Sequence, residues 1–95
     1  MKTKLTPFRV VISPKAEKQL RKIGKTDQII LARKIRLLSL SPRITGEEKL
    51  SGFKNVYRIR IGSYRIVYKR AVSVVYIILI GHRRDIYQLL KQLLG

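Results

Sequence analysis

The segment YRIRIGSYRIVY, which runs from Tyr57 to Tyr68, has a strongly alternating pattern. Apolar or aromatic side chains occur at every second position on both sides of Gly62-Ser63. A period of two is typical of β-strands, and a two-residue turn that begins with glycine is typical of a type II′ hairpin. The segment therefore predicts two antiparallel strands, Val56–Ile61 and Tyr64–Arg70, joined by a tight turn.

The two-residue turn also predicts which residues of the two strands lie opposite each other. Ile61 is expected opposite Tyr64, so Arg60 lies opposite Arg65. Arg58, two residues before Arg60, shares the same face of the sheet. The tyrosines and isoleucines of both strands lie on the other face, which we interpret as the core.

The arginine face has no obvious counter-charge in the sequence. Like charges directly opposite each other destabilise a sheet by up to ~1 kcal/mol per pair, and no acidic residue occurs between Glu48 and Asp85. A bound phosphate would offset this repulsion through charge-assisted hydrogen bonds. We interpret the face as an anion-binding site; the alternative is that the arginines simply extend into water.

The segments before the hairpin predict a strand and two helices. The apolar run at 8–12 indicates a first strand, and Ser13-Pro14 is a typical helix start. Helically spaced apolar residues follow in two segments that Gly24 separates, where we expect it to end the first helix. Thr26 or Asp27 can cap the second helix, and Ser41-Pro42 ends it.

The segments after these helices complete the fold. Residues 43–55 are polar and are expected to form a loop before the hairpin, and the apolar run at 74–80 suits a buried strand after it. Asp85 can cap a C-terminal helix. The order strand, helix, helix, three-strand meander, helix predicts one α+β domain over residues 1–95. It has an antiparallel four-stranded sheet, an N-terminal helical hairpin and a C-terminal helix.

The charge balance indicates the kind of partner. The chain of 95 residues has 22 Lys and Arg against 5 Asp and Glu, for a formal net charge of +17. The high positive charge favours a polyanionic partner, and we expect nucleic acid rather than an acidic protein. No apolar run reaches the ~20 residues of a membrane span, and the start of the chain has no secretory signal pattern. With no cysteine, disulfides are excluded, and we expect a cytoplasmic protein.

The motif GHRRDIY, from Gly81 to Tyr87, is the second candidate site. His82, Arg83 and Arg84 lie near the start of the last predicted helix, where free N–H groups favour anions. Tyr87 falls at the edge of the apolar stripe of that helix, so it can pack against the core or stack on an RNA base. The single histidine, His82, is a candidate acid or base, although a lone histidine at a strand end is more often structural or exposed.

The sequence resembles the RelE/ParE superfamily of toxins from toxin–antitoxin pairs. The matching segments are FRVVISPKAEKQLRKI, KLSGFKNVYRIRIGSYRIVYKR and VVYIILIGHRRDIY. The resemblance implies a compact toxin and, for the RelE branch, an endoribonuclease that uses neither a metal nor another cofactor. Such a toxin cuts mRNA in the ribosomal A site, where the 2′-hydroxyl of one nucleotide attacks the adjacent phosphate. An acidic cognate antitoxin, the ribosome and mRNA are the partners implied.

The resemblance also implies roles for individual residues. The catalytic set is Arg58, Arg60, Arg65, Arg83 and Tyr87. The first three would bind the phosphate, and Tyr87 would stack on the mRNA base and orient the hydroxyl.

We further expect four residues to contact RNA. They are Lys49, Lys54, His82 and Arg84. The best-studied branch has lysines where this chain has Arg58 and Arg60, and arginine is a poor base. The general base therefore stays open among the ribosome, Lys54, His82 or none.

Two other functions are compatible with the same fold, because fold does not determine function. One is a ParE-like toxin that inhibits DNA gyrase without cutting nucleic acid. The other is a nucleic-acid-binding relative that has no activity.

Overall fold

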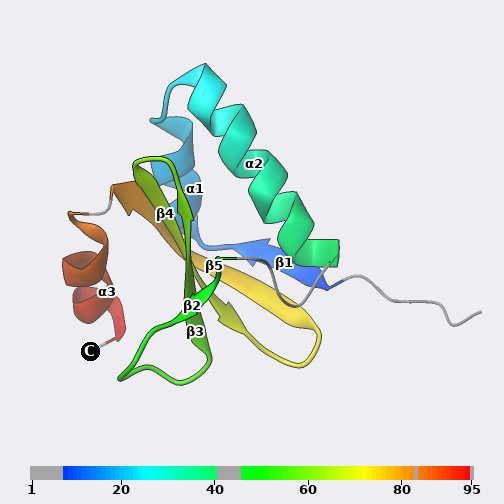
Figure 1. The fold of residues 1–95 in the computed structure, drawn as a ribbon, viewed down its shortest axis with the longest axis vertical. Helices are drawn as coiled ribbons and strands as arrows, with labels where there is room; N and C mark the ends of the chain where they lie inside the picture. Colours follow the sequence, from blue (N-terminus) through cyan, green and yellow to red (C-terminus); the bar gives the residue numbers. More distant parts are fainter. Residues whose placement is uncertain (1–7, 41–45, 83, 95) are drawn as a thin grey trace, which may run out of the picture.

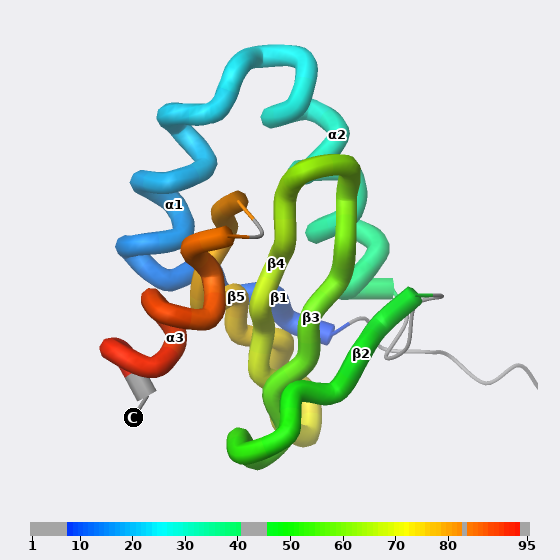
Figure 2. Tube along the Cα trace, turned by 60° about the vertical axis from the view of Figure 1, so that its left-hand side comes forward, coloured from blue at the N-terminus to red at the C-terminus, as the bar shows by residue number. Residues whose placement is uncertain are grey.

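The computed structural model describes residues 8–40, 46–82 and 84–94, and a single sheet lies at its centre (Figure 1). Within these residues the sheet has five strands, in the order β1-β5-β4-β3-β2. The strands are β1 Arg9–Ile12, β2 Glu48–Lys49, β3 Val56–Ile61, β4 Tyr64–Arg70 and β5 Val74–His82. The helices are α1 Pro14–Arg21, α2 Lys25–Leu40 and α3 Ile86–Leu94. In Figure 2, α3 is seen on one side of the strands and α2 on the other.

The α+β class and the order of the predicted elements are confirmed, but the predicted sheet is wrong in two respects. A short strand, β2, lies within the segment expected to be a loop and pairs antiparallel with β3. The first strand, β1, pairs with β5 in parallel, so the sheet is mixed and not purely antiparallel. Local periodicity does not encode which distant strand becomes a neighbour, and two residues are too few to show alternation.

The start of α1 follows the sequence prediction. The hydroxyl oxygen of Ser13 accepts a hydrogen bond from the Ala16 N–H at 3.0 Å, and Pro14 lies in the first turn. The same hydroxyl donates to the Ile78 carbonyl at 2.8 Å. The cap therefore also joins the helix to β5.

The start of α2 differs from the prediction. The Gly24 carbonyl accepts a hydrogen bond from the Gln28 N–H at 2.8 Å, and the helix already begins at Lys25. Gly24 therefore lies immediately before the second helix and accepts its first hydrogen bond, whereas the first helix ends earlier, at Arg21. Asp27 lies in the first turn of α2, where a negative charge interacts favourably with the helix dipole. Both Thr26 and Asp27 lie inside the helix, so neither is its cap.

The predicted hairpin register is confirmed. Ile61 pairs with Tyr64 and Arg60 pairs with Arg65. Gly62 has a φ of 59°, which is the left-handed conformation that the first turn residue of a type II′ hairpin requires. The face with the isoleucines and tyrosines belongs to the core as predicted, and its buried residues include Ile59, Ile66 and Tyr68. It packs against α1 and α2.

The arginine face is not fully open, because α3 packs on part of it. Val67 of β4 and Leu79 of β5 are fully buried there against Ile86 and Leu90 of α3. Each such burial contributes about 1.5–3 kcal/mol to folding. The sheet is therefore covered on both faces, and the arginines border a second, smaller core.

Candidate functional site

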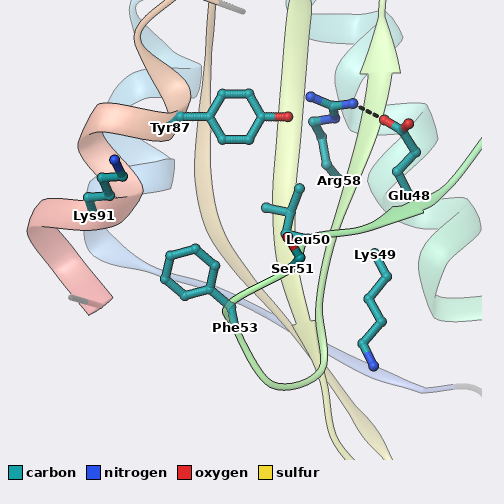
Figure 3. Close-up of a pocket in the computed structure, with 8 residues that line it drawn as sticks. All are labelled: Glu48, Lys49, Leu50, Ser51, Phe53, Arg58, Tyr87 and Lys91. Carbon is teal, nitrogen blue, oxygen red and sulfur yellow. Dashed lines mark ion pairs between the residues drawn. The ribbon is translucent and has the colours of Figure 1, made fainter.

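A cavity of about 410 Å³ lies between α3 and the edge of the sheet formed by β2 and β3 (Figure 3). Basic, acidic and aromatic side chains surround it together with apolar ones. The residues that line it are Glu48, Lys49, Leu50, Ser51, Phe53, Arg58, Tyr87 and Lys91. A predicted catalytic arginine and the predicted catalytic tyrosine therefore meet at one hollow.

Arg58 and Tyr87 are in contact across this cavity. The guanidinium carbon of Arg58 lies 5.3 Å from the ring centroid of Tyr87, a cation–π contact that contributes about 0.5–2 kcal/mol. Arg58 extends from β3, whereas Tyr87 extends from the first turn of α3, which the buried Ile86 and Leu90 fix to the sheet. Tyr87 is 42% exposed, so part of its ring is open to a ligand.

Arg58 also forms an ion pair with Glu48, drawn as a dashed line in Figure 3. This corrects the expectation that the arginine face has no nearby carboxylate. Glu48 lies on β2 directly opposite Arg58 on β3, so the pairing of the strands brings the two charges together. The polar sequence before the hairpin indicates a loop, so it does not place Glu48 on a strand beside Arg58.

Arg65 is buried, which corrects the expectation of an exposed arginine. Its residue exposure is 6%, and its Nη1 donates to the carbonyl oxygens of Tyr64 at 3.0 Å and Gly62 at 3.3 Å. The guanidinium therefore supports the hairpin turn. Arg60, its cross-strand neighbour, is exposed.

The residues predicted to contact RNA do not gather at one point. Lys49 lines the cavity, although its side chain in Figure 3 points away from Arg58. Lys54 and Arg84 are exposed and do not line it. The ring of His82 packs on Tyr64, with the ring centroids 4.8 Å apart.

His82 therefore belongs to a different part of the molecule from Arg58 and Tyr87. Its partner Tyr64 lies on the face of the sheet that packs against α1 and α2. Arg83, the remaining predicted catalytic residue, lies outside the described residues.

A second polar cluster, which was not predicted, lies on that same helix-covered face. The Glu47 carboxylate accepts hydrogen bonds from the Tyr68 hydroxyl and from Arg70. The Arg70 guanidinium lies 4.0 Å from the ring centroid of Tyr57, and the rings of Tyr57 and Tyr68 stack at 5.9 Å. The pKa of Tyr68 is raised mainly by burial and, to a smaller extent, by the hydrogen bond to Glu47.

This cluster has a consequence for the cavity. Glu47 immediately precedes β2, and its buried contacts fix the chain at the point where Glu48 turns toward Arg58. Successive strand residues point to opposite faces, so anchoring one glutamate orients the other.

One residue of the cavity was not predicted. Lys91 lines the cavity one helical turn after Tyr87, and that spacing is visible in the sequence.

Within 8–40, 46–82 and 84–94, no group of three or more His, Cys, Asp or Glu side chains could hold a metal ion. No helix in these ranges is long and apolar enough to cross a membrane.

Comparisons with known proteins give the family. A family model described as the ParE toxin of the type II toxin–antitoxin system parDE matches residues 10–87. The chain is also similar to the isolated E. coli RelE toxin, with 31% identity, a TM-score of 0.70, and coverage of 92% of this chain and 99% of that one. Comparison with curated protein sequences gave no match.

Two solved toxin–antitoxin complexes are similar as well. One is the intact E. coli RelBE complex, at 33% identity and a TM-score of 0.70, covering 79% of this chain and 95% of that chain. The other is the RelE–RelB complex of Pyrococcus horikoshii, at 26% identity and a TM-score of 0.72, covering 83% and 97%. The chain therefore belongs to the RelE/ParE superfamily of toxins of type II toxin–antitoxin systems.

Proposed function

We propose that this toxin is an endoribonuclease that cuts mRNA in the ribosomal A site. The observation that carries the proposal is the meeting of Arg58 and Tyr87 at one cavity. Cleavage of RNA by its own 2′-hydroxyl needs a cation beside the phosphate and a surface that holds the base. A guanidinium and a partly exposed aromatic ring supply these two functions.

The proposed roles follow from where each side chain lies. Attack of the 2′-oxygen increases the negative charge on the phosphoryl oxygens, and preorganised cations stabilise such a transition state. Arg58, at the cavity, and Arg60, exposed two residues along β3, are the proposed phosphate ligands. Arg65 fixes the turn beside Arg60, and Tyr87 stacks on the base.

The partners proposed are the ribosome, mRNA and an acidic antitoxin. The net charge of +17 supports binding to ribosomal and messenger RNA. The similar RelE toxins of E. coli and P. horikoshii are each in complex with a RelB-type antitoxin. An acidic partner would complement the charge of this chain.

The alternative function is inhibition of DNA gyrase. It is favoured by the description of the matching family model, which names the ParE toxin. A toxin that only binds gyrase has no chemical need for an arginine and a tyrosine joined at a cavity. The two functions can be separated by a direct assay.

The assay adds the purified protein to a translating extract and maps the 5′ ends of the mRNA fragments. We expect cuts in phase with codons that disappear when ribosomes are removed. Arg58→Ala and Tyr87→Ala should each reduce cutting. Lys18→Ala removes an equal charge from the exposed face of α1 and should have little effect. Intact mRNA together with blocked DNA supercoiling would contradict the proposal and favour gyrase inhibition.

A further inference from the structure

The general base is the missing group in the proposed cleavage site. Arginine stays protonated in proteins and lysine carries a proton at neutral pH, so both are donors and poor proton acceptors. Among the described residues that line the cavity, Glu48 is the one carboxylate. It is joined to Arg58 by an ion pair.

We propose that Glu48 is the general base that activates the 2′-hydroxyl; this inference rests on the endoribonuclease function proposed above. The carboxylate takes the proton of the 2′-hydroxyl while the 2′-oxygen forms a bond to phosphorus. The bond from phosphorus to the 5′-oxygen breaks, and that oxygen takes a proton from a solvent water. The products are a 2′,3′-cyclic phosphate and a 5′-hydroxyl, and the resulting hydroxide is neutralised by the proton that Glu48 returns to solvent.

The geometry supports this role because one guanidinium can hold both reacting partners. Arginine has five N–H donors in a fixed plane, and Glu48 engages the Nη2 group of Arg58. The remaining donors can bind the scissile phosphate. The 2′-hydroxyl is attached next to that phosphate and would lie beside the carboxylate.

Glu48 is also both held in place and reachable. The pairing of β2 with β3 places it opposite Arg58, and the buried contacts of Glu47 with Tyr68 and Arg70 fix the preceding residue. Its own side chain is 60% exposed, so RNA can approach the carboxylate. A base held in position in this way loses little entropy when the substrate binds.

A different role for Glu48 would have the opposite consequence. If the carboxylate only neutralised Arg58, it would compete with the phosphate for the guanidinium. Its removal would then strengthen RNA binding and leave cleavage as fast or faster. The sign of the change in rate therefore separates the two roles.

The test measures single-turnover cleavage by the full chain on purified ribosomes that carry a defined mRNA. Glu48→Gln keeps the shape of the side chain but cannot accept the proton, and we expect its rate to fall by about 100-fold or more. Its binding to ribosomes with a non-cleavable 2′-deoxy mRNA should not weaken. Glu48→Asp should keep part of the rate, and added formate should partly restore Glu48→Ala.

The matched control is Glu17→Gln, which removes the same charge from an exposed ion pair with Arg21 on α1 and should cleave at the normal rate. Equal or faster cleavage by Glu48→Gln would overturn the assignment of Glu48 and leave the proposed function intact. Absence of cleavage by the unaltered protein would overturn both proposals.

Discussion

Replacing Glu47 with leucine should destabilise the fold strongly, although the residue lies outside the cavity. The side chains of Glu47 and Arg70 are only 11% and 14% exposed, and the Tyr68 residue is fully buried. Leucine would leave the Tyr68 hydroxyl and the Arg70 guanidinium without their shared acceptor. Among the described residues the buried Nε of Arg70 already has no hydrogen-bond partner. Loss of Glu47 would therefore leave a second part of the guanidinium without a hydrogen bond.

The size of the effect follows from these two losses. A hydrogen bond to a charged group contributes about 1.5–3 kcal/mol, and an orphaned buried hydroxyl costs about 1–3 kcal/mol. Their combination agrees with the roughly 3–5 kcal/mol for breaking a buried ion pair. Because the pair retains some solvent contact, we expect a loss of about 3 kcal/mol in the free energy of unfolding, or roughly 12 °C or more in Tm.

The assay is urea unfolding followed by far-ultraviolet circular dichroism. Glu17→Leu is the control, because it removes the exposed ion pair with Arg21 and should cost at most about 1 kcal/mol. A loss for Glu47→Leu no larger than that of the control would contradict a structural role for the contacts of Glu47 with Tyr68 and Arg70.

Three further predictions concern single side chains. Burial and the Glu47 hydrogen bond raise the pKa of Tyr68. In the folded state Tyr68 therefore keeps its hydroxyl proton at alkaline pH values at which an unfolded tyrosine loses it. The stabilisation is present below pH ~10 and is lost as pH rises beyond it; Tyr68→Phe should flatten this alkaline fall in urea unfolding. Arg65→Ala should lower the free energy of unfolding by about 1–3 kcal/mol, whereas the exposed Arg60→Ala should change it by less than about 0.5 kcal/mol; similar values in the same assay would contradict the burial of Arg65. Tyr87→Ala should weaken RNA binding by about 1–3 kcal/mol through lost stacking, and Tyr87→Phe should keep it; equal losses in a filter-binding assay would exclude stacking.

The parts of the fold that depend on local chemistry could be predicted from the sequence. The two-residue turn at Gly62-Ser63 fixed the register that places Arg60 opposite Arg65. The cap at Ser13 and the start of α3 after Asp85 likewise follow from neighbouring residues. Each of these depends on contacts within a few positions along the chain.

The features that were missed depend on contacts between distant segments. The parallel pairing of β1 with β5 follows from how the helical hairpin packs, which no local pattern shows. The contact between Arg58 and Tyr87 follows from how α3 packs against the sheet. Glu48 is the partner of Arg58 because β2 pairs with β3, and a strand of two residues is too short to show alternation in the sequence.

Cleavage of the RNA by its own 2′-hydroxyl can be tested by removing that hydroxyl. Purified ribosomes would be loaded with an mRNA that has a single 2′-deoxy nucleotide at the A-site cleavage position, and with its all-ribose counterpart. We predict that the counterpart is cut to a fragment ending in a 2′,3′-cyclic phosphate and that the deoxy substitution abolishes the cut. Equal cutting of both mRNAs, or no cutting of either, would contradict the account.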